Sequence, residues 1–153
     1  WEDNMAISRG AGTEIIRTAH FEDIDINMQK LIIGEQHHIY TVLSVTVYCH
    51  TIQATTNDWS LYMNGYDSKA GTSAQIHNLI GANIQPTETF VWNDKFSFNG
   101  HEPTDFAGPM DSVSKQNAIA DQASSVAQYL YCKSTHADDN FEVSITYIDQ
   151  NNA

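Results

Sequence analysis

Alternation of apolar and polar residues dominates the chain and is clearest at residues 37–53, "HHIYTVLSVTVYCHTIQ". A repeat of two, with many β-branched and aromatic residues, predicts a strand. One predicted face holds Ile39, Leu43, Val45, Val47 and Cys49, and the other holds Tyr40, Ser44, Thr46, Tyr48 and His50. At about 3.3 Å per residue this run would extend about 55 Å, so we expect a bend or bulge within it.

Further strands are predicted at residues 58–67 and 73–84 and on both sides of Asn93–Asp94. The last two lie in "ETFVWNDKFSFNG", residues 88–100, where aromatic residues alternate with others. We expect these rings to fill the space between two sheets at a corner. The predicted core comprises Leu43, Val45, Val47, Leu61, Phe90, Trp92, Phe98, Val143 and Ile145.

Residues 101–125 differ in character, since proline, alanine, glutamine and serine replace the β-branched residues. We expect a long connection with one short helix, capped by Asp111 or Ser112 and ending near Gln122. The helix residues expected to point inward are Val113, Ile119 and Ala120. Residues 126–134 and 140–149 then predict a closing hairpin around the acidic turn "THADDN".

Many short strands with little helix predict an all-β fold, an antiparallel two-sheet sandwich of jelly-roll type. We expect residues 1–12 to form an N-terminal arm and residues 13–153 to form a single β-sandwich domain. The segment after the arm, "TEIIRTAHFEDID", is expected to add an edge strand.

The charge of the chain restricts its partners. Nineteen acidic and seven basic residues give a formal net charge of −12, which disfavours nucleic acid as a partner. No apolar run reaches the length of a membrane span, and the first ten residues, "WEDNMAISRG", show no secretory signal. Cys49 and Cys132 lie in apolar strands and are expected to be free buried thiols, with a disulfide as the alternative.

Motifs that carry chemistry are absent from the sequence: there is no nucleophile elbow, no zinc-protease motif and no phosphate loop. His37 and His38 are adjacent in a strand, so their side chains should point to opposite faces; Cys49 and His50 are separated likewise. A cross-strand metal site of His50 with His77 is a minor alternative. We therefore expect no catalytic residue, no cofactor and no metal.

Two further patterns allow a binding function. Asp23, Asp25 and Asn27 resemble the start of a calcium loop, but Met28 and Gly34 stand where glycine and glutamate would be needed. A solvated acidic edge strand is the interpretation we favour over a looser calcium site. A sugar-stacking platform is the second pattern, and its candidate rings are Tyr40, Tyr48, Tyr62 and Tyr66.

Several phrases of the chain resemble small structural proteins of tailed bacteriophages, particularly marine ones. These phrases are Ile84–Gly100, "IQPTETFVWNDKFSFNG", and Val143–Asp149, "VSITYID", and the resemblance covers roughly residues 37–100 and 126–149. It implies a β-sandwich on the surface of a virion, such as a head decoration protein, a head fibre or a tail component. Residues 101–125 form a longer insert than the simple form of these proteins has.

On this resemblance we expect a non-enzymatic virion protein, assembled in the host cytoplasm, whose partners are further copies of itself and a major capsid or tail protein. A trimer is the favoured homo-oligomer, on the resemblance alone. The alternatives are a receptor-binding module with a glycan as partner, and a sandwich-type lyase or glycosidase, which would need two facing carboxylates.

The arm is expected to contact a neighbouring subunit or the particle, because arms of this kind seldom bury their apolar residues on their own domain. The residues expected at this contact are Trp1, Met5, Ile7, Ile15 and Ile16. The chain begins with Trp1 rather than methionine, so the origin of the residues before Met5 is open.

Overall fold

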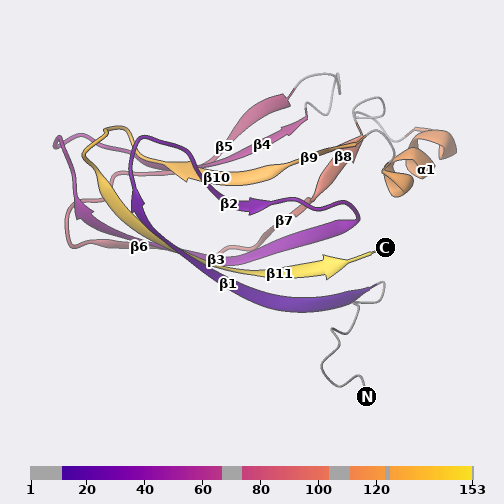
Figure 1. Cartoon of the computed structure of the whole chain (residues 1–153), viewed down its shortest axis with the longest axis horizontal. Coiled ribbons are helices and arrows are strands. Elements are labelled where there is room, and N and C mark those ends of the chain that lie inside the picture. Colours follow the sequence, from indigo (N-terminus) through magenta and orange to yellow (C-terminus); the bar gives the residue numbers. More distant parts are fainter. Residues whose placement is uncertain (1–11, 67–73, 104–110, 123–124, 153) are drawn as a thin grey trace, which may run out of the picture.

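The structure is a computed structural model, and it describes residues 12–66, 74–103, 111–122 and 125–152. Two antiparallel sheets pack against each other, which confirms the all-β sandwich (Figure 1). The first sheet has the strand order β1-β11-β3-β6, with β7 also paired to β3, and the second has the order β2-β10-β4-β5.

The strands of the first sheet are β1 (Thr13–Ile24), β11 (Asn140–Asn151), β3 (His38–Thr51), β6 (Thr89–Trp92) and β7 (Phe96–Asn99). Those of the second sheet are β2 (Gln29–Ile33), β10 (Tyr129–Lys133), β4 (Trp59–Tyr66) and β5 (Ala74–Ala82). A small ribbon of β8 (His101–Pro103) and β9 (Ser125–Ala127) lies near helix α1 (Val113–Asp121) at one end of the molecule (Figure 1).

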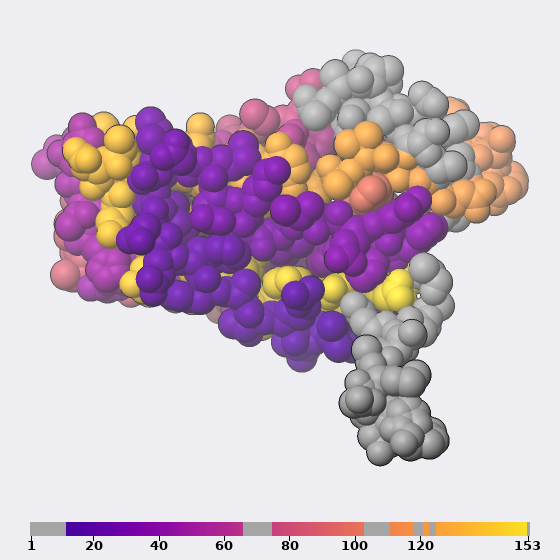
Figure 2. Space-filling model, in the orientation of Figure 1, coloured from indigo at the N-terminus to yellow at the C-terminus, as the bar shows by residue number. Residues whose placement is uncertain are grey.

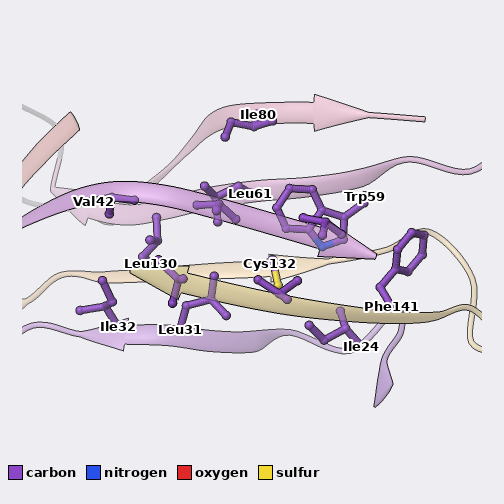
Figure 3. Packing of buried hydrophobic residues seen from close by; sticks show 14 of the residues in the cluster. Ile24, Leu31, Ile32, Val42, Trp59, Leu61, Ile80, Leu130, Cys132 and Phe141 are labelled. Carbon is purple, nitrogen blue, oxygen red and sulfur yellow. The ribbon is translucent and has the colours of Figure 1, made fainter. Parts of the chain in front are cut away.

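The core lies between the two sheets, where side chains from both inner faces meet (Figure 3). The prediction is confirmed for five residues, which are fully buried: Val45, Val47, Leu61, Val143 and Ile145. The largest of the fully buried side chains is that of Trp59 in β4, which was not on the predicted list. Alternation along β11 is complete, because odd-numbered residues from Phe141 to Asp149 are all buried.

A bulge in β3 explains why the predicted faces of this strand are only half right. Ser44 pairs with Thr146, but the next pair is Val42 with Tyr147, so Leu43 is an extra residue. The extra residue reverses the alternation, so that Tyr40 and Val42 point into the core while Leu43 is only partly buried. The expected bulge is confirmed, whereas core placement of Leu43 and surface placement of Tyr40 are wrong.

The aromatic stretch around Asn93–Asp94 forms two short strands along one side of β3. β6 pairs with Val45–Tyr48 and β7 with Ile39–Val42, so the break between them faces the bulge. Phe90, Trp92 and Phe98 are partly buried and pack against the core from this sheet edge. The prediction placed these three side chains in the fully buried core, and this is wrong: they are only partly buried. They lie at the edge of the sheet, where no further described strand covers them.

The predicted closing hairpin is wrong. β10 pairs with β2 and β4, and β11 pairs with β1 and β3, so the two strands belong to different sheets. The turn between them instead crosses the sandwich and is organised by the buried carboxylate of Asp139. Asp139 accepts hydrogen bonds from the hydroxyl of Ser134, the backbone N–H of His136 (3.2 Å) and the backbone N–H of Gln53 (2.8 Å).

The helix predicted between Ser112 and Gln122 is present as α1. Ser112 caps it, because its hydroxyl accepts a hydrogen bond from the backbone N–H of Lys115 at 3.3 Å. Val113 is 71% exposed, so its expected inward orientation is wrong. The side chains of Ile119 and Ala120 lie outside the described part of the structure. In the described residues, no helix has both the length and the apolar composition needed to span a membrane.

Candidate functional site

The longest edge strand of the described residues is β1, with twelve residues. It pairs with β11 on one side and with no described strand along the other. Ile16 lies on the outer face of the first sheet and is 71% exposed, and Ile15 is 43% exposed. In Figure 2 the indigo atoms of β1 lie on the surface of the face shown, from the left of the view toward its lower margin. Unpaired backbone groups along such an edge can accept another strand.

Of the five residues predicted at an oligomer or particle contact, Trp1, Met5 and Ile7 lie outside the described residues. Ile15 and Ile16 are neighbours in β1 and point to opposite faces of the sheet, since Ile15 pairs with buried Asp149 and Ile16 with Ile148. The edge also carries Glu14, Arg17 and Glu22, which are charges that natural edge strands use to limit indiscriminate pairing.

A pocket of about 560 Å³ lies where β3 begins and β7 ends. Its walls are amide groups, an imidazole, a hydroxyl and apolar surface, contributed by His37, Ile39, Ser97, Phe98, Asn99, Gln122 and Asn152. None of these lining residues, all from the described part of the chain, is charged like aspartate, glutamate, lysine or arginine. The pocket therefore suits an uncharged polar ligand with an apolar face.

Gln122, which follows α1, holds one wall of this pocket in place. Its backbone is in the left-handed region (φ 53°), and its side chain is nearly buried. The side-chain oxygen accepts a hydrogen bond from the backbone N–H of His37 at 2.5 Å, and the amide nitrogen donates to Asn99 Oδ1 at 3.2 Å. The side chain thus connects the end of α1 to the start of β3 and the end of β7.

A histidine–carboxylate pair lies beneath the start of β3. His38 Nδ1 donates to Asp149 Oδ1 at 2.6 Å, and Arg17 Nη1 lies 3.6 Å from Asp149 Oδ2. A buried carboxylate behind an imidazole can support a general base. Here, however, His38 is mostly buried and its Nε2 faces Glu35 Oε2 at 3.4 Å. The bond between His38 and buried Asp149 ties β3 to β11.

Two histidines and two glutamates gather on the outer face of the first sheet. His20 and Glu22 come from β1, Glu142 from β11 and His50 from β3. His50 Nε2 donates to Glu142 Oε1 at 2.7 Å, and His20 Nδ1 lies 2.8 Å from the hydroxyl of Ser144. His20, Glu22 and Glu142 were not among the site residues predicted from the sequence. The spacing His20-x-Glu22 on a strand was the available signal, since it places both side chains on one face.

The three candidate tyrosines whose side chains the structure describes, Tyr40, Tyr48 and Tyr62, do not share one exposed surface. Tyr40 is buried, and the side chain of Tyr66 lies outside the described residues. Tyr62 stacks on buried Tyr131 with ring centroids 5.1 Å apart, and Lys133 Nζ lies 5.7 Å from the Tyr62 ring centroid. Tyr48 lies on the other sheet, where its ring meets the edge of His50.

The other sequence candidates are also separated. His50 is on the first sheet and His77 on β5 of the second, so the structure does not bring this pair together. Asp25 lies in the turn between β1 and β2, where its Oδ1 accepts hydrogen bonds from the backbone N–H (2.8 Å) and side-chain amide (3.0 Å) of Asn27. Cys49 and Cys132 are free and buried, as predicted.

Comparisons with known proteins give no family for this chain: no protein-family model, no curated protein sequence and no solved structure matches it.

Proposed function

We propose that this chain is a non-enzymatic structural protein of a phage particle, most simply a capsid decoration protein, and that it assembles as a homo-oligomer through the free edge of β1. The observation that carries the assembly part is the twelve-residue edge strand with exposed Ile15 and Ile16. Antiparallel pairing of this edge with a second copy would satisfy its backbone groups and cover both isoleucines.

The order of strand pairing supports a jelly-roll type of sandwich. Along the chain, β1, β2, β3 and β4 pair with β11, β10, β6 and β5 respectively, so the first half pairs with the second half in reverse order. A long two-stranded ribbon rolled into two sheets has this pairing. The architecture occurs in viral capsid proteins and in lectins, and a fold of this kind allows the proposed function without establishing it.

Two features of the described residues bear on the glycosidase and general-base alternatives. The described lining of the pocket has no carboxylate, which a glycosidase needs in facing pairs. The imidazole of His38 is 12% exposed and is hydrogen-bonded through Nδ1 to buried Asp149. Location on a virion rests on the resemblance of Ile84–Gly100 and Val143–Asp149 to phage proteins, as does the preference for a trimer.

Matched lysine variants test the assembly interface. Ile16→Lys places a charge on β1, and Val91→Lys places the same charge on β6 at the opposite edge of the sheet, where Val91 is 56% exposed. We expect light scattering to give a multiple of the 17.1 kDa chain mass for the wild type and for Val91→Lys, but a single chain for Ile16→Lys. A wild-type protein of single-chain mass at all concentrations would contradict the assembly.

Association with a particle needs a separate test. Mass spectrometry should be applied to purified particles of the phage that encodes this chain. We expect the chain in the particle fraction, in a fixed ratio to the major capsid or tail protein. Its presence only in the soluble fraction would contradict the proposed location on the virion.

Glycan binding is the second candidate function, and the amide-lined pocket beside Phe98 is the observation that favours it. Amides pair with sugar hydroxyls, and a ring can stack on the apolar face of a sugar. Asn152→Ala removes a lining amide, while Asn78→Ala removes an exposed amide on β5 as the control. Binding on a glycan array that is lost only in Asn152→Ala would support this function, and an array without signal would contradict it.

A further inference from the structure

We propose that His20, Glu22 and Glu142 form a binding site for a divalent first-row transition metal ion of the zinc class, with His50 and Ser144 holding two of the ligands. One imidazole nitrogen and two carboxylate oxygens from these three residues lie within 4.8 Å of one another. The proposal concerns metal binding alone and does not depend on the proposed assembly.

The distances from His20 Nε2 to the two carboxylates are closer to those between ligands of one metal ion than to those of direct hydrogen bonds. Its Nε2 lies 3.6 Å from Glu22 Oε1 and 3.8 Å from Glu142 Oε2. Both distances exceed the range of good N–H···O bonds. Ligand atoms bound tetrahedrally to zinc at about 2.0–2.1 Å lie about 3.3 Å apart, so a small inward movement of the side chains would complete the shell.

The choice of ions follows from the chemistry of the donors. One imidazole with two carboxylates is a mixed nitrogen and oxygen set, which zinc and its first-row neighbours accept. Magnesium and calcium prefer oxygen ligands alone. Three protein ligands on an exposed face leave a fourth position for water. The net charge of −12 raises the local concentration of cations around the molecule.

Neighbouring side chains hold the ligands in suitable orientations. With Nε2 as the ligand of His20, its Nδ1–H can donate to the hydroxyl of Ser144 at 2.8 Å. His50 Nε2 donates to Glu142 Oε1 at 2.7 Å, which leaves Glu142 Oε2 directed to the ion. The rings of Tyr48 and His50 are nearly perpendicular, with centroids 4.9 Å apart. Outer partners of this kind fix ligand tautomer and direction.

Strand pairing explains why these residues meet. His20 pairs with Ser144 and Glu142 pairs with Tyr48, so all of them lie on the outer face of the first sheet. Glu22 follows His20 by two residues on that face. The three ligands therefore come from two adjacent strands, near the end where β1 finishes and β11 begins; Glu22 lies in the irregular pairing between Phe21 and Ile24.

Calorimetric titration of the intact chain, without a histidine tag, with zinc chloride tests the site. We expect saturable binding of one zinc per chain, with His20→Ala and Glu142→Gln weakening it at least about tenfold, and His50→Gln weakening it by about tenfold through its outer role. His77→Ala, on the second sheet, and Glu14→Gln, on β1, are matched controls that should bind as the wild type does. Magnesium chloride should bind more weakly than zinc.

Thermal unfolding without added metal gives an independent check that each variant is folded. Zinc should raise the melting temperature of the wild type and of both controls but not that of His20→Ala. Absence of saturable zinc binding to the wild type would overturn the proposal. Binding that is equal in wild type, His20→Ala and Glu142→Gln would overturn it as well, because the ion would then lie elsewhere.

Discussion

Asp139 Oδ1 accepts a hydrogen bond from the backbone N–H of Gln53 at 2.8 Å, although the two residues are 86 positions apart in the chain. This contact fastens the turn between β10 and β11 to the segment that follows β3. Because the turn crosses from one sheet to the other, the contact fixes the relative position of the two sheets at this end of the sandwich.

Replacing Asp139 by asparagine should destabilise the fold. One side-chain oxygen becomes an amide N–H₂, so a buried donor meets another donor and charge-assisted hydrogen bonds are lost. We expect the free energy of unfolding in urea to fall by about 2–3 kcal/mol. Asp138→Asn, on an exposed neighbour, is the control and should change it by less than about 0.5 kcal/mol. Equal effects of the two substitutions would contradict the role of Asp139.

The closing turn shows where sequence reasoning failed and why. A short polar link between two alternating strands predicts a hairpin, yet Cys132 and Val143 sit in opposite sheets. The alternation itself was predicted well, because each strand buries one face. The sequence does not show which strands pair with each other. A link that crosses between two sheets and a link that closes a hairpin can have the same length. The hydrogen bond between Ser134 and Asp139 holds the link in its crossing conformation, but this bond is visible only in the structure.

Bulges limited the prediction in the same way. The alternation of apolar and polar residues looks regular on both sides of Leu43. Leu43 is an extra residue in the pairing of β3 with β11, and this changes which of the alternating residues are buried. The candidate metal site depends on register too: His20-x-Glu22 is visible in the sequence, but Glu142 joins it because His20 pairs with Ser144. Long-range pairing of this kind is set by tertiary packing and leaves little local signal.

Two tryptophans of different burial should differ in their contribution to stability. Trp59 is fully buried in the core, near Cys132 and Phe141 (Figure 3), whereas Trp92 is partly buried at the sheet edge. We expect Trp59→Ala to lower the free energy of unfolding by about 3–5 kcal/mol and Trp92→Ala to lower it by about 1–3 kcal/mol. Chemical denaturation measures both. A larger loss for Trp92→Ala would contradict the placement of the core.

The two thiols should be inert in the native protein. Burial raises the pKa of Cys49 to about 11 and that of Cys132 to about 12, so very little thiolate is present at neutral pH. A thiol reagent at pH 8 should label neither cysteine in the folded chain and both after unfolding without reductant. Fast labelling of the native protein, or fewer than two thiols after unfolding, would contradict this prediction.

Tyr40 should make the fold sensitive to alkali. Burial, followed by the nearby carboxylates of Asp149 and Glu35, raises the pKa of its hydroxyl to about 12. A folded-state pKa above the unfolded value of 10.0 stabilises the fold fully below pH 10, and this contribution is lost as the pH rises from 10 towards 12. Urea unfolding at several pH values should show this fall, and Tyr40→Phe should reduce its slope. An identical slope in the variant would show that Tyr40 is not its cause.

Amide hydrogen exchange along β1 tests most directly the claim that this edge joins copies of the chain. The measurement compares residues 13–22 in the wild type, in Ile16→Lys and in Val91→Lys at the same protein concentration. We predict slow exchange of the edge amides in the wild type and in Val91→Lys, and faster exchange confined to these residues in Ile16→Lys. Fast exchange of the edge amides of residues 13–22 in all three proteins would show that the edge of β1 is not paired in solution, and would contradict the proposed assembly.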